Sequence, residues 1–164
     1  MKLFIRSENH ASQGLFASTL LSATLLIPVQ EQNNQFLGTW EAHDNGETFQ
    51  IILVNKPNYK GLDGKLYNVI LGKHTYNRGA RVIEQSLTSQ DYPLFGVPTT
   101  SNVLQLGYQD LTLKKRGRVT LTLLPNNQLR WQLTNSAETI TINRANPIKP
   151  GFTVPTDILL RRIK

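Results

Sequence analysis

The sequence predicts an all-β protein, an antiparallel up-and-down β-barrel of eight to ten strands with little helix. Beyond residue 36, apolar and polar residues alternate with the period of two that is typical of strands. The alternating segments are short and are separated by turn residues, and none has the period of an amphipathic helix. Closing such strands into a barrel removes the exposed edges of the sheet, and a flattened sandwich is the alternative.

The first 30 residues differ from the rest of the sequence. Lys2 and Arg6 give the start a positive charge, and residues 15–29 form an uncharged, mostly apolar block. A membrane-spanning helix needs about 20 such residues, so a basic leader with a shorter block predicts a signal peptide at residues 1–30. An uncleaved anchor and a buried N-terminal helix are the alternatives. We expect an exported protein, periplasmic or secreted, with one domain at residues 31–164 and no membrane span after cleavage.

The first two strands are predicted at residues 37–43 and 48–55. Gly38 lets the backbone approach another element, and the side chain of Trp40, one pleat further along, points inward. The Asn45-Gly46 pair between the two strands is a strong hairpin signal, since both residues tolerate positive φ. Apolar residues occupy both faces of the second strand. This pattern predicts a central strand, or one that is covered on both sides.

The later strands follow from the same alternation and are separated by turns. Residues 56–65 are expected to form a long connection, and the Arg116-Gly117 pair is expected to form a turn. Residues 89–102 contain Pro93, Gly96 and Pro98, which predicts a long loop that borders the open end of the barrel, as a binding loop or as a lid. The remaining strands are predicted at residues 67–76, 81–87, 103–113, 119–124, 129–134, 139–143 and 156–163.

Composition restricts the class of protein. The chain has 164 residues, of which 39% are hydrophobic and 18% charged, as expected for one globular domain. It has no Cys, which excludes disulfides, thiolate metal sites and Cys nucleophiles. The net charge of +7 attracts nucleic acid, anionic lipid or acidic polysaccharide. Because the positive residues are mostly scattered, with short clusters at residues 114–118 and 161–164, a solvated surface is the simpler interpretation, and we expect no nucleic-acid partner.

No catalytic group is evident in the sequence. Beyond the leader, His43 and His74 are the only histidines, and they lie in different predicted strands without the spacing of a metal site. The carboxylates are scattered, and several fall at turns, where Asp is common. We therefore expect no catalytic residue, no metal and no cofactor, and the protein is not expected to be an enzyme.

Aromatic residues are the remaining candidates for a binding site. They could fill the core or line a cavity, because an eight-stranded barrel is wide enough for either. Tyr hydroxyls on a cavity wall would orient the polar end of a ligand, and Tyr67 is a further member of the aromatic set. The candidate ligand-binding residues are Trp40, Phe49, Tyr76, Phe95, Tyr108 and Trp131.

The Gly38-Thr39-Trp40 segment resembles the Gly-x-Trp signature of lipocalins and the wider calycin group. This resemblance implies a barrel that encloses an apolar ligand, with Trp40 at the closed end, packed against Arg162 or Arg161 from a late strand. Gly38, Trp40 and Arg162 are thus the candidate structural residues. The Cys pairs of secreted lipocalins and their long helix before the last strand are missing.

The chain is also similar to a family of short, signal-bearing Bacteroidetes proteins that look lipocalin-like and have no established activity. The order and spacing of several motifs carry this resemblance over nearly the whole predicted domain. Besides Gly38-Thr39-Trp40, the motifs are Glu47-Thr48-Phe49-x-Ile51-x-Leu53, Gly72-x-His74-x-Tyr76, Trp131-x-Leu133-x-Asn135, and Val154-Pro155-Thr156 followed by Ile158 and Leu160.

These observations lead to one functional hypothesis and several alternatives. We expect a non-enzymatic, exported protein that holds a small apolar or amphipathic molecule inside the barrel or at its open mouth. The first alternative is an interaction domain with a filled core that acts through its exposed strands or its basic face. An oligonucleotide-binding barrel would lose affinity steeply with salt, and export argues against it. A catalytic site grafted on the barrel is the last alternative.

Overall fold

The computed structural model describes residues 35–98, 102–136 and 151–163. The predicted signal peptide at residues 1–30 and the strand predicted at residues 139–143 lie outside these residues. Within the described ranges there is no α-helix, and therefore none that could cross a membrane, and the only helical turn there is η1 (Pro125–Asn127). The strands are β1 (Gly38–Asp44), β2 (Glu47–Lys60), β3 (Leu66–Arg78), β4 (Arg81–Gln85), β5 (Leu94–Pro98), β6 (Val103–Asp110), β7 (Lys115–Leu124), β8 (Gln128–Asn135) and β9 (Asp157–Arg162).

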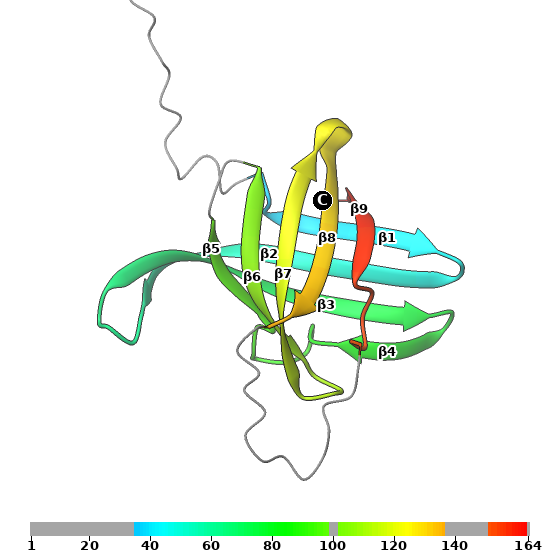
Figure 1. The fold of residues 1–164 in the computed structure, drawn as a ribbon, viewed down its shortest axis with the longest axis horizontal. Coiled ribbons are helices and arrows are strands. Elements are labelled where there is room, and N and C mark those ends of the chain that lie inside the picture. Colours follow the sequence, from blue (N-terminus) through cyan, green and yellow to red (C-terminus); the bar gives the residue numbers. More distant parts are fainter. Residues whose placement is uncertain (1–34, 99–101, 137–150, 164) are drawn as a thin grey trace, which may run out of the picture.

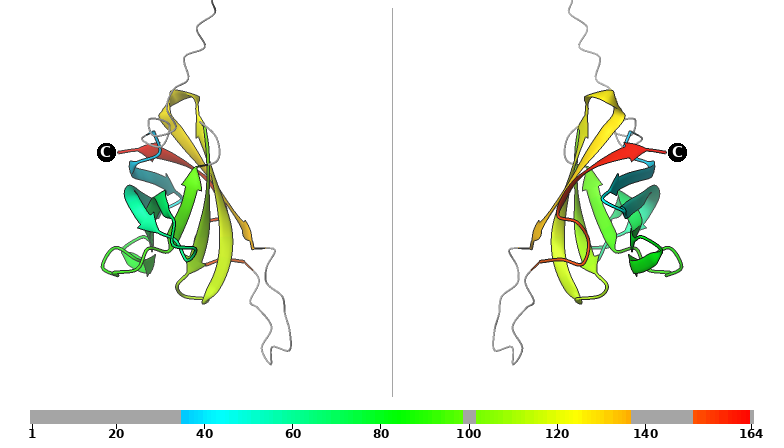
Figure 2. Two further views of the ribbon diagram at one scale, coloured as in Figure 1. Left: turned by 90° about the vertical axis from the view of Figure 1, so that its left-hand side faces the viewer. Right: turned by 90° about the vertical axis from the view of Figure 1, so that its right-hand side faces the viewer.

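Eight of these strands form a closed antiparallel barrel. The order around it is β2-β1-β9-β8-β7-β6-β5-β3, and β3 pairs with β2 to complete the circle. β4 is the extra strand and pairs with the end of β3. Strands β1 to β3 run across the view in Figure 1 while β6 to β8 run up and down, and Figure 2 shows these two groups from either side. The prediction of an all-β, up-and-down barrel with eight to ten strands is confirmed.

The hairpin between β1 and β2 follows directly from local chemistry. Asn45 and Gly46 have φ values of 49° and 79°, the positive values that a two-residue hairpin turn requires. The strands pair from Asp44 with Glu47 as far as Gly38 with Leu53. The predicted Asn45-Gly46 turn is therefore confirmed.

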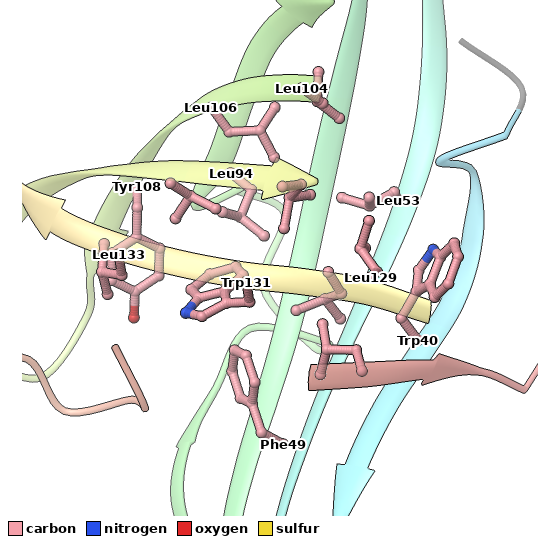
Figure 3. Packing of buried hydrophobic residues seen from close by; sticks show 14 of the residues in the cluster. Trp40, Phe49, Leu53, Leu94, Leu104, Leu106, Tyr108, Leu129, Trp131 and Leu133 are labelled. Atoms are coloured by element: carbon pink, nitrogen blue, oxygen red, sulfur yellow. The ribbon is translucent and has the colours of Figure 1, made fainter. Parts of the chain in front are cut away.

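The core lies inside the barrel and is built by alternate residues of the strands (Figure 3). On β7, Val119 and Leu121 face inward, and on β8 the inward residues are Leu129, Trp131 and Leu133. Their polar neighbours face solvent on the other side of the sheet. The period of two in the sequence thus identifies the inner face of these strands.

Of the two arrangements predicted for the second strand, the structure confirms the central position. β2 lies between β1 and β3, so it is a central strand. Its second face is not covered, because Ile52 is only half-buried and Val54 is exposed. β-branched residues suit a pleated surface even where one side faces solvent, which explains their presence there.

The loop predicted at residues 89–102 is wrong in its middle part, where β5 pairs with both β3 and β6. Gly96 does not mark a turn. A Cβ at this position would lie 2.3 Å from the backbone oxygen of Gln105, so the glycine allows close approach of the two strands. Pro98 is the last residue of the strand and lies beyond the residues that pair with β3, so it is an edge position on that side.

Two further boundaries differ from the prediction. Gly117 lies within β7, and the turn falls at residues 111–114; a Cβ on Gly117 would lie 2.6 Å from Leu133 and 2.8 Å from Phe152, so the glycine makes room for packing. The long connection predicted at residues 56–65 is shorter in the structure, because β2 continues to Lys60. Pro57 is accommodated by a β-bulge, where Asn58 has a φ of 55°.

Candidate functional site

Five of the six candidate ligand-binding residues gather inside the barrel. The ring centres of Phe49 and Trp131 lie 5.0 Å apart, and those of Tyr108 and Trp131 lie 5.9 Å apart, both edge to face. The ring centres of Tyr76 and Phe49 lie 6.2 Å apart, and Trp40 belongs to the same apolar cluster. Figure 3 shows Phe49, Trp131 and Tyr108 in sequence along the interior. The rings pack against one another, which is the arrangement of a filled core.

Phe95 is separated from the other five. It lies on the outer face of β5, where its side chain is 40% exposed and its ring centre is 5.2 Å from that of Tyr59. Its neighbour Leu94 is the residue of β5 that enters the core. In a strand, the neighbours Leu94 and Phe95 must point to opposite faces, which would have predicted the outward position of Phe95. The prediction of a loop over residues 89–102 does not use this alternation.

Trp40 is fully buried, and polar contacts surround its ring. Its Nε1 donates a hydrogen bond of 2.8 Å to the Phe36 carbonyl. The Arg162 guanidinium lies 4.3 Å from the ring centre and donates to the carbonyls of Leu37, at 2.9 Å, and Gln35. The partner of the indole is therefore Arg162 and not Arg161. Gly38 has a φ of 114°, a conformation that other residues rarely adopt.

A polar cluster that sequence reasoning missed lies toward the other side of the interior. The Glu84 carboxylate of β4 accepts hydrogen bonds of 2.8 Å from His74 Nε2 and from the Tyr108 hydroxyl on one oxygen, and 2.9 Å from the Thr112 backbone on the other. His74, Glu84 and Tyr108 are all buried. The backbone of His74 is in turn bonded to Ser86. The cluster therefore joins β3, β4 and β6.

The protonation of this cluster follows from its contacts. Burial acts to raise the pKa of the Glu84 carboxyl, but hydrogen bonds from His74, Thr112 and Tyr108 together outweigh it and lower the pKa to about 2. Burial and the neighbouring Glu84 charge raise the pKa of the Tyr108 hydroxyl. Glu84 is thus an anion and Tyr108 a donor at neutral pH. His74 Nδ1 is buried and has no partner among the described residues.

No sequence signal could have found the pairing of His74 with Glu84. A register shift between Tyr76 and Asn77 brings Glu84 opposite Tyr76, next to His74 on the inner face. Such a bulge depends on tertiary packing rather than on local sequence. Because the cluster is sealed from solvent and its carboxylate is fully engaged, it is suited to fixing three strands rather than to receiving a substrate.

The segment at residues 151–156 covers the end of the core next to this cluster. Asp110, which is fully buried, accepts hydrogen bonds from Thr153, at 2.7 Å from the backbone and 3.0 Å from the hydroxyl, and from Leu113 at 2.6 Å. Trp131 Nε1 donates to the Pro155 carbonyl at 2.8 Å. Phe152 packs on Tyr108 with ring centres 6.0 Å apart. The segment thus seals the interior at this end.

The Tyr76 ring is buried, but its hydroxyl and the His43 side chain make polar contacts closer to the surface. Tyr76 donates from its hydroxyl to the Glu47 carboxylate, which also accepts a 2.7 Å bond from Arg78. His43 Nε2 lies 2.6 Å from Glu41, on the exposed side of β1. Within the described residues, no group of three or more His, Cys, Asp or Glu side chains could hold a metal ion.

A shallow groove follows the junction between β1 and β9. The register of the two strands pairs Trp40 with Arg162 and Glu41 with Arg161, and no pairing continues beyond Glu41. One part of the groove has a volume of about 610 Å³ and includes His43, Arg130 and Leu159 in its lining. Arg130 and Asp157 form an exposed ion pair of 2.7 Å in this wall. The groove is open to solvent.

No curated protein and no solved structure matches this chain. A family model, by contrast, matches residues 3–95, which include β1 to β4 and the start of β5. The closed barrel of this chain is compatible with a family of barrel proteins. The resemblance to lipocalins stays a prediction. The match covers more than half of the sequence, so the chain belongs to the family of unknown function DUF6705.

Proposed function

We propose that this protein is a non-enzymatic, exported binding module whose barrel is filled by its own side chains and which binds through its outer surface. The observation that supports this most is the contact of Phe49, Trp131 and Tyr108 across the interior. Three rings in edge-to-face contact occupy the space that a ligand inside the barrel would need.

Other features support the remaining parts of the proposal. The basic leader and the apolar block at residues 15–29 favour export, and a chain without Cys is compatible with an oxidising compartment. The buried carboxylates Glu84 and Asp110 are each held by several hydrogen bonds within the fold. A general acid or base needs a free position toward a substrate, so these groups are better suited to a structural role.

A carrier of a small apolar or amphipathic ligand is the second candidate. The eight-stranded closed barrel favours it, since barrels of this size can hold one small molecule. His74 Nδ1 is buried without a partner among the described residues, so it could form a hydrogen bond with a polar group of such a ligand. For this to occur, Phe49 and Trp131 must move apart.

The two candidates differ in what the interior can take up. Every described strand lies within residues 35–163, so a chain of residues 31–164 keeps the whole barrel. We expect native mass spectrometry of this chain to show the bare mass, and titration with N-phenyl-1-naphthylamine to show no saturable uptake. One probe bound per chain, or a stoichiometric molecule lost on denaturation, would establish the carrier instead.

A cavity variant provides the positive control. Trp131→Ala removes the central indole and should create a cavity that takes up indole, with a rise in melting temperature. If this variant does not fold, Leu106→Ala with benzene serves the same purpose, because small apolar cavities accept benzene. Uptake by the variant and none by the unmodified chain shows that the method detects interior binding and that the native interior is full.

A further inference from the structure

The hairpin that joins β2 to β3 extends beyond the barrel as an arm, defined here as residues 56–68 (Figure 1). All of its residues are exposed except Gly61, which is half-buried. No residue of the arm belongs to the main apolar core that the described residues form. The apolar side chains of the arm therefore do not stabilise the barrel interior.

The arm has a defined structure although it is exposed. Tyr59 pairs with Tyr67, and Lys60 pairs with Leu66. At the tip, the Gly61 amide donates to the Lys65 carbonyl at 2.8 Å, and the Tyr67 hydroxyl donates to Asp63 at 2.6 Å. Side chains on such a hairpin are held in place before they meet a partner, which lowers the entropy cost of binding.

The arm combines apolar and positively charged side chains. Leu62 is fully exposed at the tip, and Leu66 is 65% exposed beside it. Lys56, Lys60 and Lys65 against Asp63 give the arm a net charge of +2. Tyr59 and Tyr67 lie behind the tip and are partly exposed. Leucine at the tip, lysine beside it and tyrosine behind it is the order of side chains that suits a membrane interface.

The apolar surface of the arm continues onto the barrel. Tyr59 packs on Phe95 of β5, with ring centres 5.2 Å apart, and Val97 of the same strand is exposed. Val69 on β3 is 1% exposed although it does not belong to the main core. The aromatic pair thus forms the base of the arm on the outer face of the barrel.

We infer that the arm docks the barrel on an anionic lipid surface, with Leu62 and Leu66 entering the headgroup region and the three lysines contacting lipid phosphates. The inference rests on the proposed function, because a module with a filled core binds from its outside. Charge complementarity favours this occupant, since the arm and the whole chain are both positive. Asp63 opposes it, but its carboxylate already accepts hydrogen bonds from the Tyr67 hydroxyl and from the backbone amide of Lys65.

Vesicle sedimentation tests the inference directly. The chain of residues 31–164 lacks the apolar leader, so the leader cannot cause binding. We expect it to bind vesicles with 30% phosphatidylglycerol in phosphatidylcholine at least tenfold more tightly than vesicles of phosphatidylcholine alone, and to be released by salt at about 0.5 M. Equal binding to both, or binding to neither, would overturn the inference.

Paired variants locate the binding surface. Leu62→Ser with Leu66→Ser should lower the partition coefficient at least tenfold, and Lys60→Gln with Lys65→Gln should do the same for anionic vesicles only. The matched controls are Leu159→Ser with Ile163→Ser, also exposed apolar residues, and Arg81→Gln with Arg161→Gln, also exposed cations. If the controls lose as much binding as the arm variants, the arm is not the docking site.

A tryptophan at the tip reports insertion. Trp40 and Trp131 are fully buried, so their emission should not respond to vesicles. In a Leu62→Trp variant we expect a blue shift with anionic vesicles and quenching by brominated lipid. An unchanged spectrum at saturating vesicle concentration contradicts insertion. If the chain instead dimerises through the arm as its concentration rises, the surface binds a second copy of the chain. Neither result bears on the filled core, which the indole and N-phenyl-1-naphthylamine measurements test separately.

Discussion

The guanidinium of Arg162 lies 4.3 Å from the centre of the Trp40 ring and donates hydrogen bonds to the carbonyls of Leu37 and Gln35. Trp40 itself donates to the Phe36 carbonyl. One side chain of β9 therefore holds both the indole and the segment that leads into β1. The two strands pair at two residue pairs, with one further backbone hydrogen bond from Ile163 to Thr39, so this side-chain contact is a large part of their junction.

Replacing Arg162 should therefore weaken the fold. We expect Arg162→Ala to lower the free energy of unfolding by about 2 kcal/mol, the combined effect of a partly buried cation–π contact and charged hydrogen bonds. Arg162→Lys should recover only part of the loss, because an ammonium lacks the planar fork. Urea unfolding followed by tryptophan fluorescence measures this. Arg161→Ala, an exposed neighbour, should change stability by less than about 0.5 kcal/mol.

The Glu84 cluster should make the protein acid-sensitive. The pKa of Glu84 falls from an ordinary 4.5 to about 2 in the folded chain, so its contribution to stability is complete above pH 4.5 and is lost as the pH falls toward 2. Urea unfolding between pH 6 and pH 2 should show this loss. Glu84→Gln should show a flatter dependence over the same range. Glu47, Asp63 and Asp157, whose pKa values are also lowered, are present in both proteins and cancel in the comparison.

Asp110 should be among the most sensitive acidic residues. Asp110→Ala leaves Thr153 and Leu113 without their acceptor, and we expect a loss of about 3 kcal/mol together with faster proteolysis near residue 152. Asp157→Ala breaks exposed contacts with Arg130 and Gln132 and should cost less than about 1 kcal/mol. Equal losses in the two variants would show that the segment at residues 151–156 is not held by Asp110.

Two glycines on neighbouring strands should respond differently to the same substitution. In Gly96→Ala the new Cβ meets a backbone oxygen at 2.3 Å, so β5 must move, and we expect a loss of about 2 kcal/mol or more. In Gly107→Ala the nearest atom is 3.6 Å away, and stability should change by less than about 1 kcal/mol. Thermal unfolding of both variants tests the difference.

The parts of the fold that could be predicted from sequence are those with a local cause. The alternation around Val119 and Leu121 identifies a strand with one buried face, and the Asn45-Gly46 pair identifies a hairpin, because each depends on neighbouring residues alone. Trp40 was placed inside the barrel by the same reasoning. These signals were sufficient for the class of fold.

The parts that could not be predicted depend on distant contacts. Gly117 is a residue type that is common in turns, yet it lies in a strand. Phe152 and Leu133 pack where a side chain at this position would be. His74 and Glu84 meet only because of the bulge at Tyr76, which no local pattern marks. Residue type alone predicts Phe95 among the interior rings, although the pleat of β5 turns it outward.

The junction of β1 with β9 also sets the order in which this barrel can be completed. β1 and β9 are the first and last of the described strands, so the barrel can close only when both ends of the described chain come together. Contacts of such long sequence separation make folding slow. A circular permutant that connects β9 directly to β1 and opens the β7–β8 turn would make the two β1–β9 pairs local but would separate the eight β7–β8 pairs in sequence, so we expect it to fold more slowly in refolding experiments. The contact of Arg162 with Trp40 therefore forms only when the barrel has closed.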